Sequence, residues 1–345
     1  MKKIDIDFTN TVTAWFRENQ RDLPWRKDQD PYHVWVSEIM LQQTRVEAVR
    51  EYYRRWMEAL PTIRDLAESS EETLLKLWQG LGYYNRVRNM QKAAQMIMQE
   101  YHGVFPDQYD EIRRLPGIGE YTAGAIASNC FDRRIAAVDG NVLRVMSRLT
   151  EDDSDILKQA TKRQYAKLLQ EIYPENHCGE FTQGIMEIGA VICVPNGSPK
   201  CEICPVWEFC GAKEHQSIGR YPVKAAKKER KIIEMTVFIL TCKDRTAVQK
   251  RPAGGLLAGL YQYPNLQQNM SASEALKAVE EWGGQPSGLS RRSEYRHIFS
   301  HVEWHMTGYY ISCERETRGP GKDFVWADSR QMKESIPLPS AFQYF

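Results

Sequence analysis

Four cysteines, Cys193, Cys201, Cys204 and Cys210, form the densest group of potential metal ligands in the 345-residue chain. They are separated by seven, two and five residues, and no histidine lies among them. Four thiolates in one run can hold either a [4Fe–4S] cluster or a zinc ion. Zinc ribbons pair two Cys-x-x-Cys motifs, and this run contains one, so its spacing favours the iron–sulfur cluster.

Asp139 lies in the segment AVDGNVLRV, directly before Val142, Val145 and Met146, which follow one another at helical spacing. An aspartate at this point is expected to cap the helix by accepting hydrogen bonds from its first backbone N–H groups. The same carboxylate can also face a positive charge that develops on a substrate. Asp139 is therefore a candidate catalytic group, with helix capping alone as the simpler interpretation.

Glu38 lies in the segment VWVSEIMLQQT, next to Val36, Ile39 and Met40. Apolar surroundings raise the pKa of a carboxyl group and allow it to hold a proton near neutral pH. Taken alone, the segment favours a surface glutamate on an amphipathic helix. An acidic role for Glu38 therefore depends on the other motifs.

The segment LPGIGEYTAGAI (115–126) predicts a helix-hairpin-helix motif, because Pro116 and two glycines form a tight turn before a helix rich in small residues. Free backbone N–H groups at a helix N-terminus favour an anion such as phosphate. Gly117 and Gly119 lack a Cβ, so a phosphate could approach the turn closely. The alternative is an ordinary corner between two helices.

Apolar residues at helical spacing predict that residues 1–210 are mostly helical. Such spacing is clear at 74–81 and 87–101, and further helices are expected at about 123–130 and 142–149. Most of these apolar residues are expected to pack in the core.

Residues 232–345 have a different composition, with β-branched and aromatic runs separated by Gly and Pro. This pattern predicts an α+β domain with one helix at about 273–282. Strands are expected at 235–240, around 261–263, at 301–311 and at 324–327.

Residues 213–231 lack an apolar period and are expected to form a linker with a basic end. A solvated charge run is the simpler interpretation, and phosphate contact requires that the rest of the chain binds nucleic acid. The formal net charge of the chain is +1, so total charge indicates no partner. The basic residues at its end are Lys224, Lys227, Lys228, Arg230 and Lys231.

The N-terminal sequence MKKIDIDFTN has no apolar segment after its lysines, and no long uninterrupted apolar run follows. A cytoplasmic protein without a membrane span is therefore expected. In a reducing compartment, clustered thiols more often bind metal than form disulfides.

Together these motifs resemble the endonuclease-III-like superfamily of helix-hairpin-helix DNA glycosylases and, within it, the adenine DNA glycosylases of the MutY type. The resemblance covers nearly the whole chain. It also includes LPWR (23–26), SEIMLQQTRV (37–46), WQGLGYYNRVRN (78–89) and the triplet Phe299-Ser300-His301. The family removes adenine mispaired with 8-oxoguanine or guanine from duplex DNA in base excision repair.

The resemblance implies an all-α glycosylase part followed by an α+β Nudix-like domain. The glycosylase part (1–212) would consist of a six-helix barrel, residues 29–136, and a cluster domain, residues 1–28 and 137–212. A linker (213–231) would lead to the Nudix-like domain (232–345), which helps to recognise 8-oxoguanine. The chain is expected to be a monomer that binds duplex DNA containing the mispair.

The resemblance also implies roles for individual residues. Glu38 would protonate adenine, and Asp139, supported by Tyr121 and Asn141, would stabilise the oxocarbenium ion. The flipped adenine would be bound by Arg26 and Gln183. Four residues would enter the duplex near the lesion: Gln43, Thr44, Leu81 and Tyr83. Ser300 would contact 8-oxoguanine, and its neighbours Phe299 and His301 would belong to the DNA-binding residues, as would Gly117 and Gly119 of the hairpin. The four clustered cysteines would hold a [4Fe–4S] cluster.

The chain departs from the family pattern in two places. Seven residues separate Cys193 from Cys201, where the family usually has six, and the turn PNGSP can accommodate the extra residue. The Nudix metal-binding box is incomplete, because Leu276 and Lys277 stand where Arg-Glu is expected before Glu280-Glu281-Trp282-Gly283. Lesion recognition, not nucleotide hydrolysis, is therefore the expected role of the C-terminal domain.

Two alternatives remain. Pyrimidine glycosylases with lyase activity need a lysine amine for a Schiff base, and this chain has Tyr121 at that position. A catalytically silent DNA-binding module is the second alternative, and the presence of both Glu38 and Asp139 disfavours it.

Overall fold

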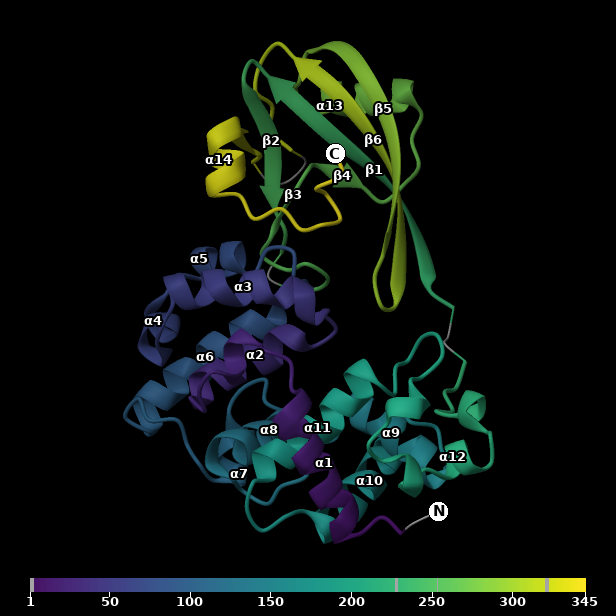
Figure 1. Cartoon of the computed structure of the whole chain (residues 1–345). Helices are drawn as coiled ribbons and strands as arrows, with labels where there is room; N and C mark the ends of the chain where they lie inside the picture. The colour runs from purple at the N-terminus through teal and green to yellow at the C-terminus, as the bar shows by residue number, and fades with distance from the viewer. Residues whose placement is uncertain (1–2, 227–228, 253, 320–322) are drawn as a thin grey trace. The chain divides into compact units, whose positions relative to one another are not determined.

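The structure is a computed structural model that describes residues 3–226, 229–252, 254–319 and 323–345 (Figure 1). The chain divides into two compact units. The first comprises residues 1–68 and 89–226, and the second comprises residues 69–88 and 227–345. Segment 69–88, which the predicted domain limits assign to the N-terminal part, thus groups with the C-terminal residues. Lys227 and Lys228 of the predicted linker lie outside the described residues.

The first unit is helical, as the apolar periodicity predicts, and α6 enters it from the second unit. None of the helices in the described part of the chain combines the length and apolar character that a membrane crossing requires. The helices of the first unit are α1 (Ile6–Asn19), α2 (Pro31–Leu41), α3 (Val46–Ala59), α4 (Ile63–Glu68), α6 (Asn85–Glu100), α7 (Tyr109–Arg114), α8 (Glu120–Phe131), α9 (Gly140–Thr150), α10 (Gln159–Ile172), α11 (Cys178–Val191) and the short α12 (Gly211–Glu214).

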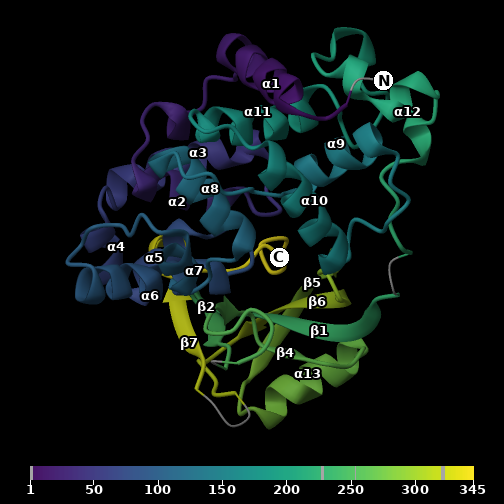
Figure 2. The same cartoon turned by 90° about the horizontal axis from the view of Figure 1, so that it is seen from below.

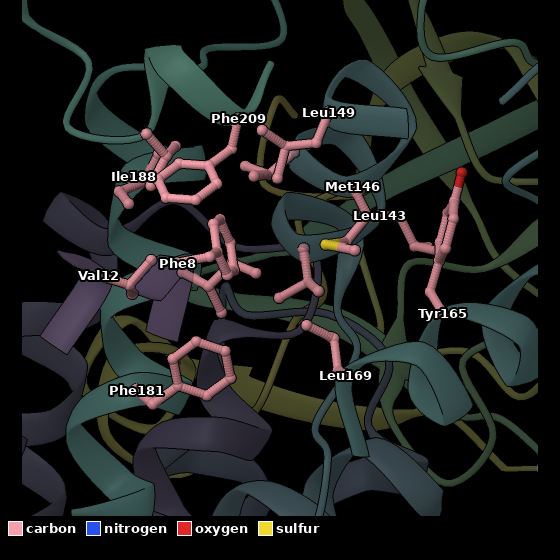
Figure 3. Packing of buried hydrophobic residues seen from close by; sticks show 14 of the residues in the cluster. Phe8, Val12, Leu143, Met146, Leu149, Tyr165, Leu169, Phe181, Ile188 and Phe209 are labelled. Carbon is pink, nitrogen blue, oxygen red and sulfur yellow. The ribbon is translucent and has the colours of Figure 1, made fainter. Parts of the chain in front are cut away.

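A core of the first unit joins α1, α9, α10 and α11 (Figure 3). Phe8 of α1 packs edge-to-face against Phe181 of α11 and against Phe209, with ring centroids 6.2 and 5.5 Å apart. Burial of one such side chain stabilises the fold by about 1.5–3 kcal/mol. Because Phe209 directly precedes Cys210, this packing ties the cysteine-rich segment to the helices.

The predicted helix-hairpin-helix motif is present as α7, a tight turn and α8. Gly117 has φ of +80°, and a Cβ there would lie 2.7 Å from the Cβ of Asn89. Only glycine satisfies both the left-handed backbone and this close approach. Gly119 is the N-cap of α8, so the helix begins at the point that the Gly-x-Gly pattern indicates.

The second unit contains a mixed sheet, which confirms the expected α+β class. The strand path is β3-β2-β1-β6-β5; β1 and β6 pair in parallel and the other pairs are antiparallel. The elements are α5 (Glu71–Leu77), β1 (Lys231–Cys242), β2 (Arg245–Lys250), β3 (Tyr261–Gln262), β4 (Asn265–Leu266), α13 (Ala272–Glu281), β5 (Pro286–Ile298), β6 (Val302–Cys313), β7 (Val325–Asp328) and α14 (Ser329–Glu334).

The two faces of this sheet carry separate cores, because side chains alternate along β1. Val237 and Ile239 pack with Leu338 and Phe342 of the C-terminal segment. Phe238 and neighbouring strand residues pack against α13. Figure 2 shows α13 on one face of the sheet and the C-terminal end on the other.

Three features differ from the predicted elements. Strands β2, β4 and β5 are additional to the predicted ones, and β5 is largely exposed, so its sequence lacks an apolar alternation. The predicted strand at 301–311 begins at Val302. Part of segment 213–231 is ordered against the first unit, where the Val223 carbonyl accepts a hydrogen bond from the Ile156 N–H at 3.1 Å.

Candidate active site

A cavity of about 500 Å³ opens in the first unit between α2, α8, α9, α11 and the turn Pro24–Arg26. This volume lies within the range of roughly 300–1,000 Å³ that is typical of small-molecule pockets. The cavity brings together eight of the predicted site residues from distant parts of the chain. They are Arg26, Glu38, Gln43, Thr44, Tyr121, Asp139, Asn141 and Gln183.

Asp139 is the N-cap of α9, as predicted, and three donors hold its carboxylate. Oδ1 accepts from the backbone N–H groups of Asn141 and Val142 at 2.9 and 2.8 Å, and Oδ2 accepts from Asn141 Nδ2 at 2.7 Å. Burial raises the pKa of Asp139, and these hydrogen bonds oppose the rise. The local sequence therefore fixes the orientation of this carboxylate through its own helix end.

Helix α11 touches the beginning of α9 through a glycine. A Cβ at Gly189 would lie 2.5 Å from the Cβ of Asn141, so no larger residue fits there without a shift. The buried side chain of Arg144 bridges this contact, because Nη2 donates to Asn141 Oδ1 at 2.8 Å and to the Gly189 carbonyl at 2.6 Å. Its Nε donates to the Cys193 carbonyl at 2.6 Å. Asn141, and with it Asp139, is thus held against α11.

Glu38 lies on α2, and its Oε2 accepts a hydrogen bond from the Tyr121 hydroxyl at 2.5 Å. Removal of water by the surrounding protein raises the pKa of Glu38 to about 7; Tyr121 opposes this rise, and the charge of Asp139 adds to it. A large share of the molecules therefore carries a proton on Glu38 at neutral pH. Burial also raises the pKa of Tyr121, which keeps its hydroxyl a donor.

Arg26 and Gln183 lie in the wall of the same cavity. The Arg26 guanidinium donates from Nη2 to Glu187 Oε2 at 2.9 Å and from Nη1 to the Arg21 carbonyl at 3.2 Å. It also lies over the Phe16 ring, 5.2 Å from the centroid. Gln183 precedes Glu187 by one helical turn on α11, so both residues face the cavity.

The cavity can support acid-assisted cleavage of a bond to a nitrogen base. A protonated carboxyl group can donate to a leaving group, and a fixed carboxylate can stabilise the cation that forms. Guanidinium and amide groups can bind the edge of a planar base through hydrogen bonds. The roles of Glu38, Asp139, Arg26 and Gln183 remain predictions.

Cys193, Cys201, Cys204 and Cys210 line one small cavity in the first unit, together with Arg148. Among the described residues, no three His, Cys, Asp or Glu side chains form a group that could hold a metal ion. A single zinc ion needs the sulfur atoms of all its thiolate ligands at about 2.3 Å from the metal, whereas in a [4Fe–4S] cluster each of four thiolates binds a different iron. The four thiols line one cavity, so they are together the residues that could hold such a group.

The surroundings of these cysteines fit thiolate ligands. Arg148 Nη1 donates to Cys193 Sγ at 3.1 Å, and a cationic donor stabilises thiolate charge. The extra residue between the first two cysteines lies in a closed loop, because the Lys200 N–H donates to the Ile192 carbonyl at 3.0 Å. Gly197 in this loop has φ of +77° and open space around it.

The second unit holds five more of the predicted DNA-contacting residues, Leu81, Tyr83, Phe299, Ser300 and His301, whereas Gly117 and Gly119 lie in the first unit. Phe299, Ser300 and His301 form the turn between β5 and β6, and the Ser300 hydroxyl is hydrogen-bonded to the Tyr83 hydroxyl. The Tyr83 side chain is 49% exposed, whereas Leu81 is 6% exposed. Tyr83 is therefore accessible as it stands, and entry of Leu81 into a duplex would require a local rearrangement.

Sequence patterns alone do not single out three buried charged residues near these sites: Arg144, Arg148 and Glu187. They are 6%, 7% and 1% exposed. Arg144 and Arg148 lie one turn apart on α9, and Glu187 lies one turn after Gln183 on α11, so they share helix faces with other polar residues. The signal that could have identified them is the one used for Glu38, a charged residue next to apolar residues in the sequence.

Comparisons with known proteins find matches for both parts of the chain. Residues 36–174 match the family described as HhH-GPD superfamily base excision DNA repair protein, and residues 236–345 match the NUDIX domain. The adenine DNA glycosylase of Rattus norvegicus is 31% identical, over 98% of this chain and 78% of its own length.

Two solved structures are similar to the helical part. A thermostable thymine-DNA glycosylase has a TM-score of 0.55 and 28% identity, covering 61% of this chain and 96% of its own. A trapped endonuclease III–DNA covalent intermediate, described as an estranged-adenine complex, has a TM-score of 0.51 and 26% identity. That match covers 60% of this chain and 94% of the endonuclease III chain.

Proposed function

The chain belongs to the adenine DNA glycosylase family, which removes adenine from mispairs in base excision repair, and we propose that its substrate is adenine opposite 8-oxoguanine in duplex DNA. The observation that carries the proposal is the pairing of Glu38 and Asp139 in one cavity. Their environments differ: Glu38 tends to hold a proton, and Asp139 is surrounded by donors.

In the proposed reaction, the adenine nucleotide first leaves the base stack and enters the cavity. Glu38 then donates its proton to a ring nitrogen of adenine, and the bond from the sugar C1′ to N9 breaks with its electron pair on adenine. The sugar becomes an oxocarbenium ion that the Asp139 carboxylate stabilises. Water adds to C1′ and its proton passes to a carboxylate, which leaves an abasic site and free adenine.

The division of labour between the two carboxyl groups is similar to glycoside hydrolysis, where one group is an acid and the other stabilises the cation. A lyase mechanism has less support, because Tyr121 occupies the position of the Schiff-base lysine and donates its hydroxyl to Glu38. Measurement of adenine release in a single turnover, from duplexes with adenine opposite 8-oxoguanine or guanine, tests the proposal. A duplex that is bound but never loses adenine would contradict it.

We further propose that the four cysteines hold a [4Fe–4S] cluster, which would supply structure to the DNA-binding segment and take no part in bond cleavage. Protein prepared without air is expected to contain about four iron atoms and no zinc per chain and to absorb at about 400 nm. Cys204→Ser should lower both iron content and duplex affinity, whereas Cys130→Ser, outside this cavity, should change neither. Metal analysis that finds one zinc and no iron would contradict the cluster.

The β5–β6 turn is proposed to read 8-oxoguanine, which differs from guanine by a C8 oxygen and an N7 hydrogen. The Ser300 hydroxyl can accept from that N–H, although it can also donate to guanine N7. Ser300→Ala is therefore expected to lower the ratio of excision rates, adenine opposite 8-oxoguanine over adenine opposite guanine, by about 5- to 100-fold.

Ser287→Ala is the matched control, because Ser287 is an exposed serine at the other end of β5. Its rate ratio should equal that of the unmodified protein. An unchanged ratio in a variant with Phe299, Ser300 and His301 all replaced by alanine would mean that Gln43 and Thr44 read the lesion without this turn.

A further inference from the structure

Glu187 is a buried carboxylate that holds two arginines at the wall of the active-site cavity. Its side chain is 1% exposed. Oε1 accepts from Arg21 Nε at 2.6 Å and from the Arg21 backbone N–H at 3.2 Å, while Oε2 accepts from Arg21 Nη2 at 3.0 Å and Arg26 Nη2 at 2.9 Å. Burial opposes ionisation of Glu187, but hydrogen bonds from both arginines outweigh it and lower its pKa to about 2.

The bidentate pair with Arg21 would by itself join segment 21–26 to α11. The additional bond to Arg26 holds a guanidinium at the wall of the active-site cavity, because Arg26 lines the cavity that contains Glu38. Arg26 has a second anchor at the Arg21 carbonyl and a third at the Phe16 ring. The guanidinium is therefore held in one orientation before any base enters, which reduces the ordering cost of binding.

We infer that Glu187 is a positioning residue for adenine excision: it fixes the Arg26 guanidinium at the adenine-binding wall and offsets its charge near Glu38. The inference rests on the proposed function, in which Arg26 binds adenine and Glu38 donates the proton. Glu187 itself acts only through Arg21 and Arg26.

The charges around Glu38 explain why the positive charge of Arg26 needs a neighbouring carboxylate to compensate it. Tyr121 of α8 donates to it, Asp139 at the start of α9 raises its pKa, and Arg26 from the Pro24–Arg26 turn lowers its pKa. An uncompensated cation at Arg26 would favour ionised Glu38 and would oppose the cationic sugar. The Glu187 carboxylate reduces both effects while it keeps the hydrogen-bonding edge of Arg26 in place.

The decisive test is the pH dependence of single-turnover adenine release in the full-length protein. Glu187→Gln should lower the rate at pH 7.5 by about tenfold and should move the midpoint of the alkaline limb down by about 0.5–1 pH unit. Glu187→Asp, which keeps the charge, should retain the midpoint. The matched control is Glu51→Gln, because Glu51 forms a bidentate pair with Arg54 on the exposed surface of α3; its profile should be unchanged.

Arg21→Gln is expected to move the midpoint of the alkaline limb in the opposite direction. This variant tests the inference even if Glu187→Gln does not fold. It leaves the Glu187–Arg26 pair in place and removes one positive charge, so the midpoint should move up. The double variant Glu187→Gln/Arg21→Gln should bring the midpoint back toward that of the unmodified protein. Shifts in the same direction for both single variants would overturn the electrostatic part of the inference.

A binding measurement separates this inference from the proposed chemistry. The probes are two 8-oxoguanine duplexes, one with non-cleavable 2′-fluoroadenosine and one with an abasic analogue at the same position. Glu187→Gln should lower the affinity ratio between them by about fivefold or more, since a loosely held Arg26 contributes less to base binding. An unchanged ratio together with an unchanged midpoint would overturn the inference. A missing alkaline limb in the unmodified protein would instead contradict Glu38 as the acid, and the affinity ratio would still decide the role of Glu187.

Discussion

Replacement of Asp139 by asparagine is expected to lower the single-turnover rate of adenine release by about 10²–10³-fold. A neutral amide cannot stabilise the oxocarbenium ion, and loss of one preorganised electrostatic group costs on the order of 10²–10³ in rate. The amide oxygen can still accept from the backbone N–H groups of Asn141 and Val142, so the N-cap and the fold should survive. Duplex affinity should change little, because the charge on the sugar exists only late in the reaction.

The control for this experiment is Asp5→Asn, which alters the N-cap of α1 in the same unit. That variant should keep both excision and binding. Parallel losses of duplex affinity and excision rate in Asp139→Asn would show that Asp139 serves only as a helix cap.

Glu38→Gln is expected to lower the excision rate by about 10²–10⁴-fold, the usual contribution of a general acid. In the unmodified protein, the pKa of Glu38 at about 7 means that the proton is lost as pH rises through neutrality. The rate should therefore fall above about pH 7, and this alkaline limb should be absent from the residual activity of Glu38→Gln. A rate profile that is flat between pH 5 and 9 in the unmodified protein would exclude Glu38 as the acid.

The same substitution should raise stability, and this result distinguishes lost chemistry from misfolding. Ionisation of Glu38 is disfavoured in the folded state and free in the unfolded state, so the residue destabilises the fold progressively from about pH 4.5 to 7 and fully above pH 7. Glu38→Gln should therefore increase the free energy of unfolding by about 1–3 kcal/mol at pH 8 and by little at pH 4. Denaturant unfolding measures both values, with the exposed Glu58→Gln on α3 as the control.

Local features of the sequence predicted several parts of the site correctly. The N-cap position of Asp139, the tight turn at Gly117 and Gly119, and the helical character of residues 1–210 all depend on residues within a few positions of one another. Hydrogen bonds at a helix end and left-handed backbone at a glycine are local interactions. They act in the same way whatever the rest of the chain does.

The strands show where local prediction ends. The buried strand β1 was identifiable because its apolar residues serve two cores, one on each face of the sheet. The exposed strand β5 is polar along most of its length and owes its conformation to pairing with β6. Its role in carrying Ser300 at a hairpin turn therefore depends on a partner strand that no local pattern in β5 reveals.

By itself, the sequence determined which residues could do chemistry: two candidate carboxyl groups, a candidate phosphate-binding turn and four clustered thiols. The tertiary structure decided which of them act together. Glu38 looks like a surface glutamate in its own segment, but in the folded chain burial raises its pKa to about 7, the charge of Asp139 adds to the rise, and Tyr121, 83 residues away, opposes it. Glu187 meets Arg26 across 161 residues. Charge, burial and pKa depend on neighbours in space, and only the packing of α2, α8, α9 and α11 creates those neighbours.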